Sequence, residues 1–120
     1  MTGKVLIVDD EPRVGAILQE VLRHEGYEVD FVDRPNEALN QLKKTAFDVL
    51  ITDLRMPEMN GLELLDRAKE IRPECQVIVV TAFGAVDTAR VALKRGAVDY
   101  ITKPFSAERE LIPVLDSIFS

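Results

Sequence analysis

Short aliphatic stretches alternate along the chain with segments in which hydrophobic residues recur every three or four positions. The stretches are rich in β-branched residues and bounded by polar ones, a pattern that predicts β-strands. They lie at residues 4–8, 27–32, 49–52, 77–80 and 99–102. The segments that follow them have helical periodicity, so the chain is predicted to alternate strand and helix five times.

The first of the five predicted helices has the clearest boundaries, since Pro12 stands near its start and Gly26 past its end. Its apolar positions follow the i, i+3, i+4 pattern at Val14, Ile17, Leu18, Val21 and Leu22. The other four helices are marked by Ala38, Leu39 and Leu42; by Leu62, Leu65 and Ala68, closed by Pro73; by Val86, Ala89 and Leu93; and by Leu111, Leu115 and Ile118.

Turn and cap residues mark the ends of the last two helices. Gly84 is interpreted as a turn glycine, Gly96 occupies the C-terminal cap position of the fourth helix, and Ser106 is the predicted N-cap of the fifth. Pro113 interrupts that fifth helix. Because proline lacks a backbone donor and crowds the preceding turn, we expect a bend or a late start there.

The first, third and fourth predicted strands contain nearly continuous aliphatic runs (VLIV, VLI and VIVV), as expected of strands covered on both faces by helices. Strand and helix in alternation, with right-handed crossovers, predict an α/β fold. The expected architecture is a doubly wound five-stranded parallel sheet, flavodoxin-like, with strand order 2-1-3-4-5 and five helices. Since no repeat or linker interrupts the pattern, residues 1–120 are expected to form one domain.

Composition narrows the class of protein. The 120 residues include 21 acidic and 15 basic side chains, for a formal net charge of −6. A chain of this charge with no cluster of Lys and Arg is not expected to bind nucleic acid directly. The longest aliphatic runs are far too short to span a membrane, so a cytoplasmic protein is expected. Cys75 is the single cysteine and is interpreted as a loop thiol.

Polar residues follow four of the five predicted strands, at the edge where the carboxyl ends of parallel strands meet. Asp9 and Asp10 follow the first strand, Asp53 the third, Thr81 the fourth and Lys103 the fifth. Three close carboxylates repel one another unless a cation compensates them. Oxygen ligands without a nearby His or Cys favour a hard divalent ion, Mg²⁺ or alternatively Mn²⁺.

A carboxylate beside Mg²⁺ and Lys103 could attack a phosphoryl group, so phosphoryl transfer to aspartate is the leading hypothesis. Each residue alone also has a structural interpretation. Asp10 or Glu11 could cap the first helix, Asp53 could be a turn residue, Thr81 an ordinary strand residue and Lys103 a solvated lysine. Their convergence at one edge favours the functional interpretation.

Four motifs, VLIVDDE, VLITDLRMPEMNGLELL, VIVVTA and DYITKPF, resemble the receiver domain of two-component response regulators in order and spacing. Residues 81–105 are similar to receivers of NtrC-type sigma-54 activators. The resemblance implies a switch, phosphorylated by a sensor histidine kinase or acetyl phosphate, that catalyses only its own phosphorylation and dephosphorylation. Such regulators continue into output domains that control transcription, so the chain is either an excised receiver or a stand-alone one.

The resemblance also assigns roles at the predicted metal site. Asp53 would accept the phosphoryl group. Asp10 would bind Mg²⁺ directly and Asp9 largely through water. Asp53 and the backbone carbonyl of Arg55 would complete the protein ligands.

Further roles concern the switch. Lys103 would pair with the phosphoryl group, and its peptide bond to Pro104 is expected to be cis. Thr81 would bond a phosphoryl oxygen, and the ring of Tyr100 would turn into the space that Thr81 vacates. Arg55 and Ala82 would tune the lifetime of the phosphorylated state. A homodimer through the fourth helix, fifth strand and fifth helix is implied, in a region where Pro113 departs from the family.

Three competing functions fit the sequence less well than this one. A phosphatase of the haloacid dehalogenase type would carry D-x-D-x-T after the first strand, where this chain has Asp9-Asp10-Glu11-Pro12-Arg13. A flavodoxin would need a phosphate-binding loop there, and three acids would repel a phosphate. The third alternative is a receiver-like interaction module that no longer accepts phosphate.

Overall fold

The computed structural model describes residues 3–82 and 86–120, so Gly84 and the side chain of Val86 lie outside the described part. The chain alternates strand and helix as predicted. The elements are β1 (Lys4–Val8), α1 (Pro12–His24), β2 (Glu28–Val32), α2 (Pro35–Lys44), β3 (Val49–Asp53), α3 (Gly61–Ile71), β4 (Gln76–Thr81), α4 (Val86–Lys94), β5 (Asp99–Thr102), a π-helical turn η1 (Ala107–Leu111) and α5 (Ile112–Phe119). Each strand begins and ends within one residue of its predicted bounds.

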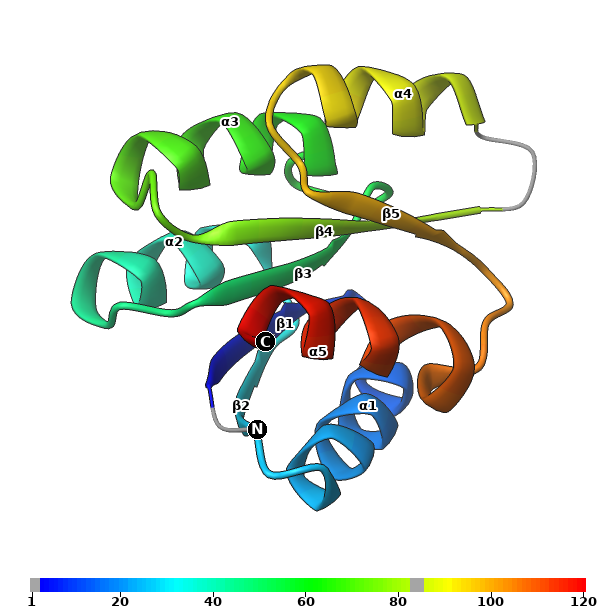
Figure 1. Ribbon diagram of the computed structural model, residues 1–120. Coiled ribbons are helices and arrows are strands. Elements are labelled where there is room, and N and C mark those ends of the chain that lie inside the picture. Colours follow the sequence, from blue (N-terminus) through cyan, green and yellow to red (C-terminus); the bar gives the residue numbers. More distant parts are fainter. Residues whose placement is uncertain (1–2, 83–85) are drawn as a thin grey trace.

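The five strands form one parallel sheet in the order β2-β1-β3-β4-β5, which confirms the predicted topology. Helices α2, α3 and α4 cover one face of the sheet, and α1 and α5 cover the other (Figure 1). The strand order reverses between β1 and β3, so loops leaving these two strands diverge to opposite sides and open a crevice at their carboxyl ends.

Two hydrophobic clusters fill the spaces on either side of the sheet. Successive strand residues point to opposite faces, so Leu6 and Val8 pack under α2 and α3 while Val5 and Ile7 pack against α1 and α5. All five residues of β3 are buried. The central strand therefore holds Asp53, its last residue, on a fixed backbone.

Two glycines and two polar residues cap helices; Gly26, Gly96 and Ser106 were predicted to do so, and Asn60 was not. Gly26 and Gly96 adopt φ of 95° and 109°, a conformation that other residues rarely adopt. Ser106 accepts a hydrogen bond from the amide of Arg109, as predicted for an N-cap. Asn60 caps α3 by accepting from the amide of Glu63.

Pro113 delays the last α-helix. The residues before it form the π-helical turn, in which the amide of Ile112 donates to the carbonyl of Ala107. The α-helical geometry begins at Ile112, so Pro113 lies in the first turn of α5. Proline has no N–H to donate to the preceding turn, and the helical hydrogen-bond spacing changes from π to α at this point. The predicted late start is confirmed.

Three side chains differ in exposure from the simplest expectation. Ile17 and Leu93 were predicted on buried helix faces but are 63% and 37% exposed, because the apolar stripes of α1 and α4 are wider than the surfaces they cover. Cys75 does lie in a loop, yet it is completely buried, and burial raises its pKa to about 11. None of the helices in the described ranges is long and apolar enough to cross a membrane.

Candidate phosphoryl and metal site

Three carboxylates meet at the carboxyl ends of β1 and β3. Asp9 and Asp10 follow β1, and Asp53 ends β3. One carboxylate oxygen from each lies within 4.8 Å of the other two. Asp9 and Asp53 are buried while Asp10 is exposed, so the group, hereafter the acidic trio, is open to solvent on one side. The predicted convergence of the three carboxylates is confirmed.

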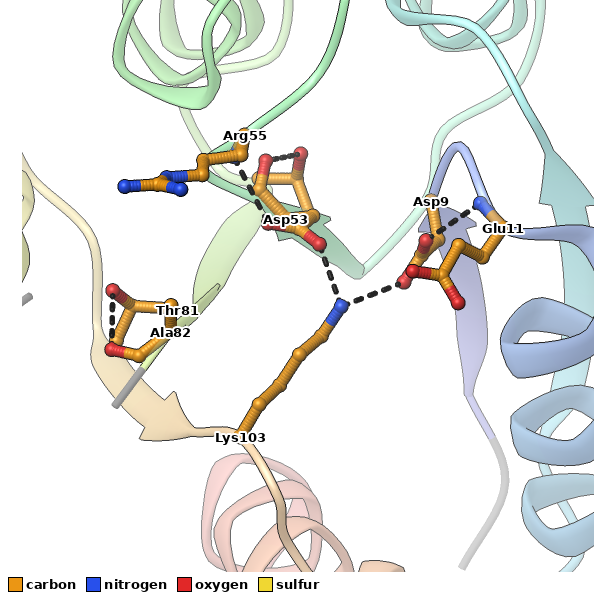
Figure 2. Close-up of polar contacts among 8 residues, drawn as sticks. Asp9, Glu11, Asp53, Arg55, Thr81, Ala82 and Lys103 are labelled. Carbon is orange, nitrogen blue, oxygen red and sulfur yellow. Dashed lines mark hydrogen bonds and ion pairs between the residues drawn. The ribbon is translucent and has the colours of Figure 1, made fainter. Parts of the chain in front are cut away.

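Lys103 joins two members of the trio from the far edge of the sheet. Its Nζ lies 2.7 Å from Oδ2 of Asp53 and 3.5 Å from Oδ2 of Asp9 (Figure 2). The preceding residue ends β5, and the Lys103–Pro104 peptide bond is cis, as expected. A charge-assisted hydrogen bond this short holds the ammonium directly against the predicted phosphoacceptor.

Backbone amides hold the second oxygen of each buried carboxylate. Oδ1 of Asp9 accepts from the amide of Glu11 at 2.8 Å, and Oδ1 of Asp53 accepts from the amide of Arg55 at 2.9 Å. Asp53 therefore also acts as a turn residue, as the structural interpretation suggested. It does so through Oδ1, while its Oδ2 contacts Lys103. Glu11 is the residue before α1 but makes no side-chain cap bond, so capping does not explain the acids after β1.

The electrostatics of the trio favour a bound cation. Burial raises the pKa of Asp9, as do the charges of Asp53 and Asp10, although the amide of Glu11 and the ammonium of Lys103 oppose the shift. Burial lowers the pKa of Lys103, but the hydrogen bond and charge of Asp53, together with Asp9, outweigh it and raise the pKa overall. Three carboxylates against one ammonium leave a formal charge of −2 in the site.

The residues present fit a hard divalent cation. The donors are all carboxylate oxygens, the ligand type that Mg²⁺ and Mn²⁺ prefer. A shallow pocket of about 380 Å³ lies beside Asp10 and is lined by the loop after β3, including Arg55 and Asn60. This space can admit the water ligands that Mg²⁺ usually keeps.

Of the two predicted switch residues, Thr81 ends β4 and Tyr100 is the second residue of β5. Thr81 is buried, and its hydroxyl contacts the carbonyl of Ala82 at 3.5 Å. In Figure 2, Thr81 and Ala82 lie to one side of Asp53 and Lys103, with no polar contact drawn between Thr81 and Asp53. Tyr100 is half-buried and packs against the cluster beneath α2, α3 and α4.

Two neighbours of Asp53 were not predicted as site residues. The hydroxyl of Thr52 donates to the backbone carbonyl of Asp53, and Gly61 packs directly against the same carbonyl. The signal for Thr52 was present in the sequence, because it is the one hydroxyl in an otherwise aliphatic strand before Asp53. Gly61 carried no such signal, since its contact is tertiary.

Known proteins match this chain along nearly its whole length. The response regulator receiver domain model matches residues 5–115. The transcriptional regulatory protein ZraR of Klebsiella oxytoca is 40% identical over 105 residues, and the response regulator protein FleR of Pseudomonas aeruginosa is 40% identical over 107. These matches cover 88% and 89% of this chain but 24% and 23% of the relatives, so the chain spans about a quarter of their length.

Solved structures agree with the sequence relatives. NtrX from Brucella abortus superimposes with a TM-score of 0.92 at 33% identity, covering 98% of this chain and 27% of that one. The beryllofluoride-activated NtrC4 receiver domain gives 0.88 at 39% identity, covering 97% and 96%. The resemblance to NtrC-type receivers is thereby confirmed. The chain belongs to the receiver-domain family of two-component response regulators.

Proposed function

We propose that Asp53 accepts a phosphoryl group and that this event switches the conformation of the domain. The observation that carries the proposal is the 2.7 Å contact between Nζ of Lys103 and Oδ2 of Asp53, set beside two further carboxylates. A buried carboxylate bordered by an ammonium and a cation site has the nucleophile and the charge stabilisation that phosphoryl transfer requires.

In the proposed reaction, a carboxylate oxygen of Asp53 attacks phosphorus and forms the new P–O bond. The bond from phosphorus to the donor breaks, and its electron pair leaves with an imidazole nitrogen of a phosphohistidine or with the acetate of acetyl phosphate. Lys103 stabilises the charge on the phosphoryl oxygens. The amide of Arg55 keeps the other carboxylate oxygen in place.

Mg²⁺, when bound, would neutralise phosphoryl oxygens that the acids would otherwise repel. The ligands proposed for it are Asp9, Asp10, Asp53 and the backbone carbonyl of Arg55, with Asp10 direct and Asp9 largely through water. The exposure of Asp10 and the engagement of both oxygens of Asp9, with Glu11 and Lys103, support that division.

A sensor histidine kinase is the proposed protein donor. An apolar groove of about 710 Å³ runs from Val14 and Ile17 on α1 to Phe105 and Ala107 after β5, and it borders Lys103. Ile17 is 63% exposed in this groove. An apolar surface beside the acceptor can bury a partner that presents phosphohistidine to Asp53.

The proposed readout passes through Thr81 and Tyr100. A phosphoryl oxygen would accept a hydrogen bond from the Thr81 hydroxyl in place of its 3.5 Å contact with Ala82. Tyr100 would then move inward, and the surface of α4, β5 and α5 would change. Arg55 and the small Ala82 are proposed to set how fast water hydrolyses the phosphorylated state.

The downstream parts of the proposal concern the whole regulator. We propose a cytoplasmic protein in which this domain, residues 1–120, controls transcription through an output domain. A homodimer is proposed through α4, β5 and α5, where Val98 and Ile118 border a pocket of about 320 Å³. Pro113 lines the same pocket.

The test is incubation with acetyl phosphate and Mg²⁺, followed by measurement of the intact mass with an assay in which the phosphorylated aspartate tolerates the acid used. Wild type is expected to gain one phosphoryl group, and Asp53→Asn is expected to gain none, because the amide is not a nucleophile. A phosphoryl gain that persists in Asp53→Asn, or no gain in wild type even with a cognate kinase, would overturn the assignment.

A second experiment tests the proposed kinase surface. Ile17→Asp should slow transfer from a kinase while leaving acetyl phosphate reactivity intact.

A further inference from the structure

The backbone carbonyl of Asp53 is contacted from the side opposite the acidic trio. Thr52 precedes Asp53 in β3, so its side chain points to the other face of the sheet, the face covered by α2, α3 and α4. Thr52 is completely buried. Its hydroxyl donates to the carbonyl oxygen of Asp53 at 3.0 Å. A buried hydroxyl therefore bonds to the peptide that carries the phosphoacceptor.

The first residue of α3 approaches the same peptide. The amide of Gly61 donates to the carbonyl of Leu54 at 2.9 Å. A Cβ added to Gly61 would lie 2.6 Å from the carbonyl oxygen of Asp53 and 2.6 Å from Cα of Leu54. Both are backbone atoms of a buried segment, so they cannot move aside as a flexible side chain can. Only glycine lets α3 begin this close to β3.

Gly3 and Gly15 show how unusual that contact is. A Cβ on Gly3 would meet the ring of Phe119, and one on Gly15 would meet the ring of Phe31. In both cases the obstacle is a side chain that can change rotamer. Among these three crowded glycines, Gly61 alone is opposed by the main chain.

We infer that Thr52 and Gly61 are positioning residues for the phosphoacceptor, acting through the Asp53–Leu54 peptide rather than by contact with phosphate or metal. This inference rests on the proposed function of Asp53. The peptide leads directly to Arg55, whose amide donates to Oδ1 of Asp53 and whose carbonyl is the proposed metal ligand. A displacement of the peptide would thus alter two proposed metal ligands together, Asp53, which is also the nucleophile, and the carbonyl of Arg55.

The sharpest test is Thr52→Val, which keeps the shape of the side chain and removes only the hydroxyl. We expect the fold to be retained and Mg²⁺ affinity, measured calorimetrically, to weaken by about threefold to tenfold, the effect of one hydrogen bond. Without metal, the Arg55 amide resonance should shift and exchange faster with solvent. Thr52→Ser restores the hydroxyl and should return affinity to within about twofold of wild type.

Gly61→Ala probes the second contact, with Gly15→Ala as its control. Both substitutions crowd a buried glycine, so both should lower stability. Gly61→Ala alone should weaken Mg²⁺ binding and slow phosphoryl acceptance, by roughly tenfold to a hundredfold for a displacement approaching 1 Å. Rates are compared at equal concentrations of folded protein.

The outcomes separate this inference from the proposed function. If wild type accepts no phosphoryl group, the proposed function fails. If wild type is phosphorylated but Thr52→Val matches it in Mg²⁺ affinity, Arg55 amide exchange and rate, the positioning role of Thr52 is refuted. Equal losses in Gly61→Ala and Gly15→Ala would likewise refute the role of Gly61, because they would reflect stability alone.

Discussion

The two ends of the sheet use charged side chains in opposite ways. At the carboxyl ends of the strands, charges face one another, with Lys103 set between Asp9 and Asp53. At the amino ends, Lys4 and Glu28 form only a long, exposed ion pair of 3.9 Å, and two other basic side chains, Arg72 and Lys69, bind backbone carbonyls instead. Arg72 donates to the carbonyls of Leu42 and Lys43, and Lys69 donates to those of Pro73 and Cys75.

This difference separates stability from chemistry along the strands. The basic residues at the amino ends bind carbonyls at the end of α2 and in the loop before β4, groups that no helical bond satisfies. The carboxyl ends keep a net negative charge in a partly buried place, a state that repulsion disfavours until a cation arrives. Substitutions at the amino ends should therefore change mainly the free energy of unfolding, and those at the carboxyl ends mainly metal binding and the response to phosphorylation.

The largest expected effect comes from Lys103→Ala, with Lys69→Ala as the same substitution at the other end. Lys103→Ala should retain Mg²⁺ binding, because the acidic trio remains, yet lose the conformational response to phosphorylation. The measurement is the set of amide shift changes caused by phosphorylation, followed by NMR. Lys69→Ala should respond as wild type does, with lower stability. An unchanged response in Lys103→Ala would contradict the role proposed for Lys103.

Arg72→Ala is expected to cost about 2 kcal/mol of unfolding free energy, since hydrogen bonds from a charged donor contribute more than neutral ones. Urea denaturation measures this. Arg67 provides the control, because its exposed ion pair with Glu63, 3.0 Å long, contributes only about 0.5 kcal/mol. Phosphoryl acceptance should be intact in both variants. A loss of acceptance in folded Arg72→Ala would show that the two ends are coupled.

The contrast between the ends also explains what the sequence could predict. Strand order and the acidic trio followed from local signals, because each strand is a short aliphatic run and each acid directly follows one. Asp9, Asp10, Asp53 and Lys103 could be placed at one edge without knowing any side-chain conformation. Their roles toward metal and phosphate remain predictions.

Contacts that depend on how elements pack could not be predicted in this way. Periodicity placed Ile17 in the core, but the width of the covering surface decides burial, and Ile17 is 63% exposed. The bonds from Arg72 to the end of α2 join residues about thirty positions apart. The contact of Gly61 with the Asp53 peptide depends on where α3 starts relative to β3. No local pattern encodes these distances.

Tyr27 offers a smaller, pH-dependent test at the amino end. Its hydroxyl donates to Oδ1 of Asp116 at 2.7 Å, and its ring lies 5.4 Å from that of Phe119. Burial raises the pKa of Tyr27 above its usual value of 10, and the bond to the Asp116 carboxylate raises it further. Because the folded-state pKa is the higher one, this stabilisation is complete below pH 10 and is lost as the pH rises through the folded-state pKa.

Tyr27→Phe should therefore lower the unfolding free energy by about 1.5 kcal/mol at pH 7. The difference between wild type and variant should shrink as the pH rises above 10. Urea titrations of both proteins across that range measure it. Phosphoryl acceptance at pH 7 should not change. If the difference in unfolding free energy stays constant with pH, the stabilisation by Tyr27 does not depend on its hydroxyl being protonated, which contradicts the prediction.

The smallest expected effect is a gain in stability on substituting Asp9, whereas the substitutions at the amino end should lower stability. Asp9→Asn removes one charge from the acidic trio, and its amide oxygen can still accept from Glu11, so the metal-free protein should gain up to about 1 kcal/mol of stability. Saturating Mg²⁺ should reverse the order, because ligand at about 100 times its dissociation constant adds about 2.7 kcal/mol to wild type and less to a variant that binds it weakly. Thermal unfolding with and without Mg²⁺ measures both states. Asp30→Asn serves as the control, because Asp30 is an exposed acid on β2.

A lower stability of metal-free Asp9→Asn would contradict this expectation. It would mean that Lys103 and the Glu11 amide already compensate the charge of Asp9, so that repulsion among the acids does not destabilise the carboxyl end of the sheet.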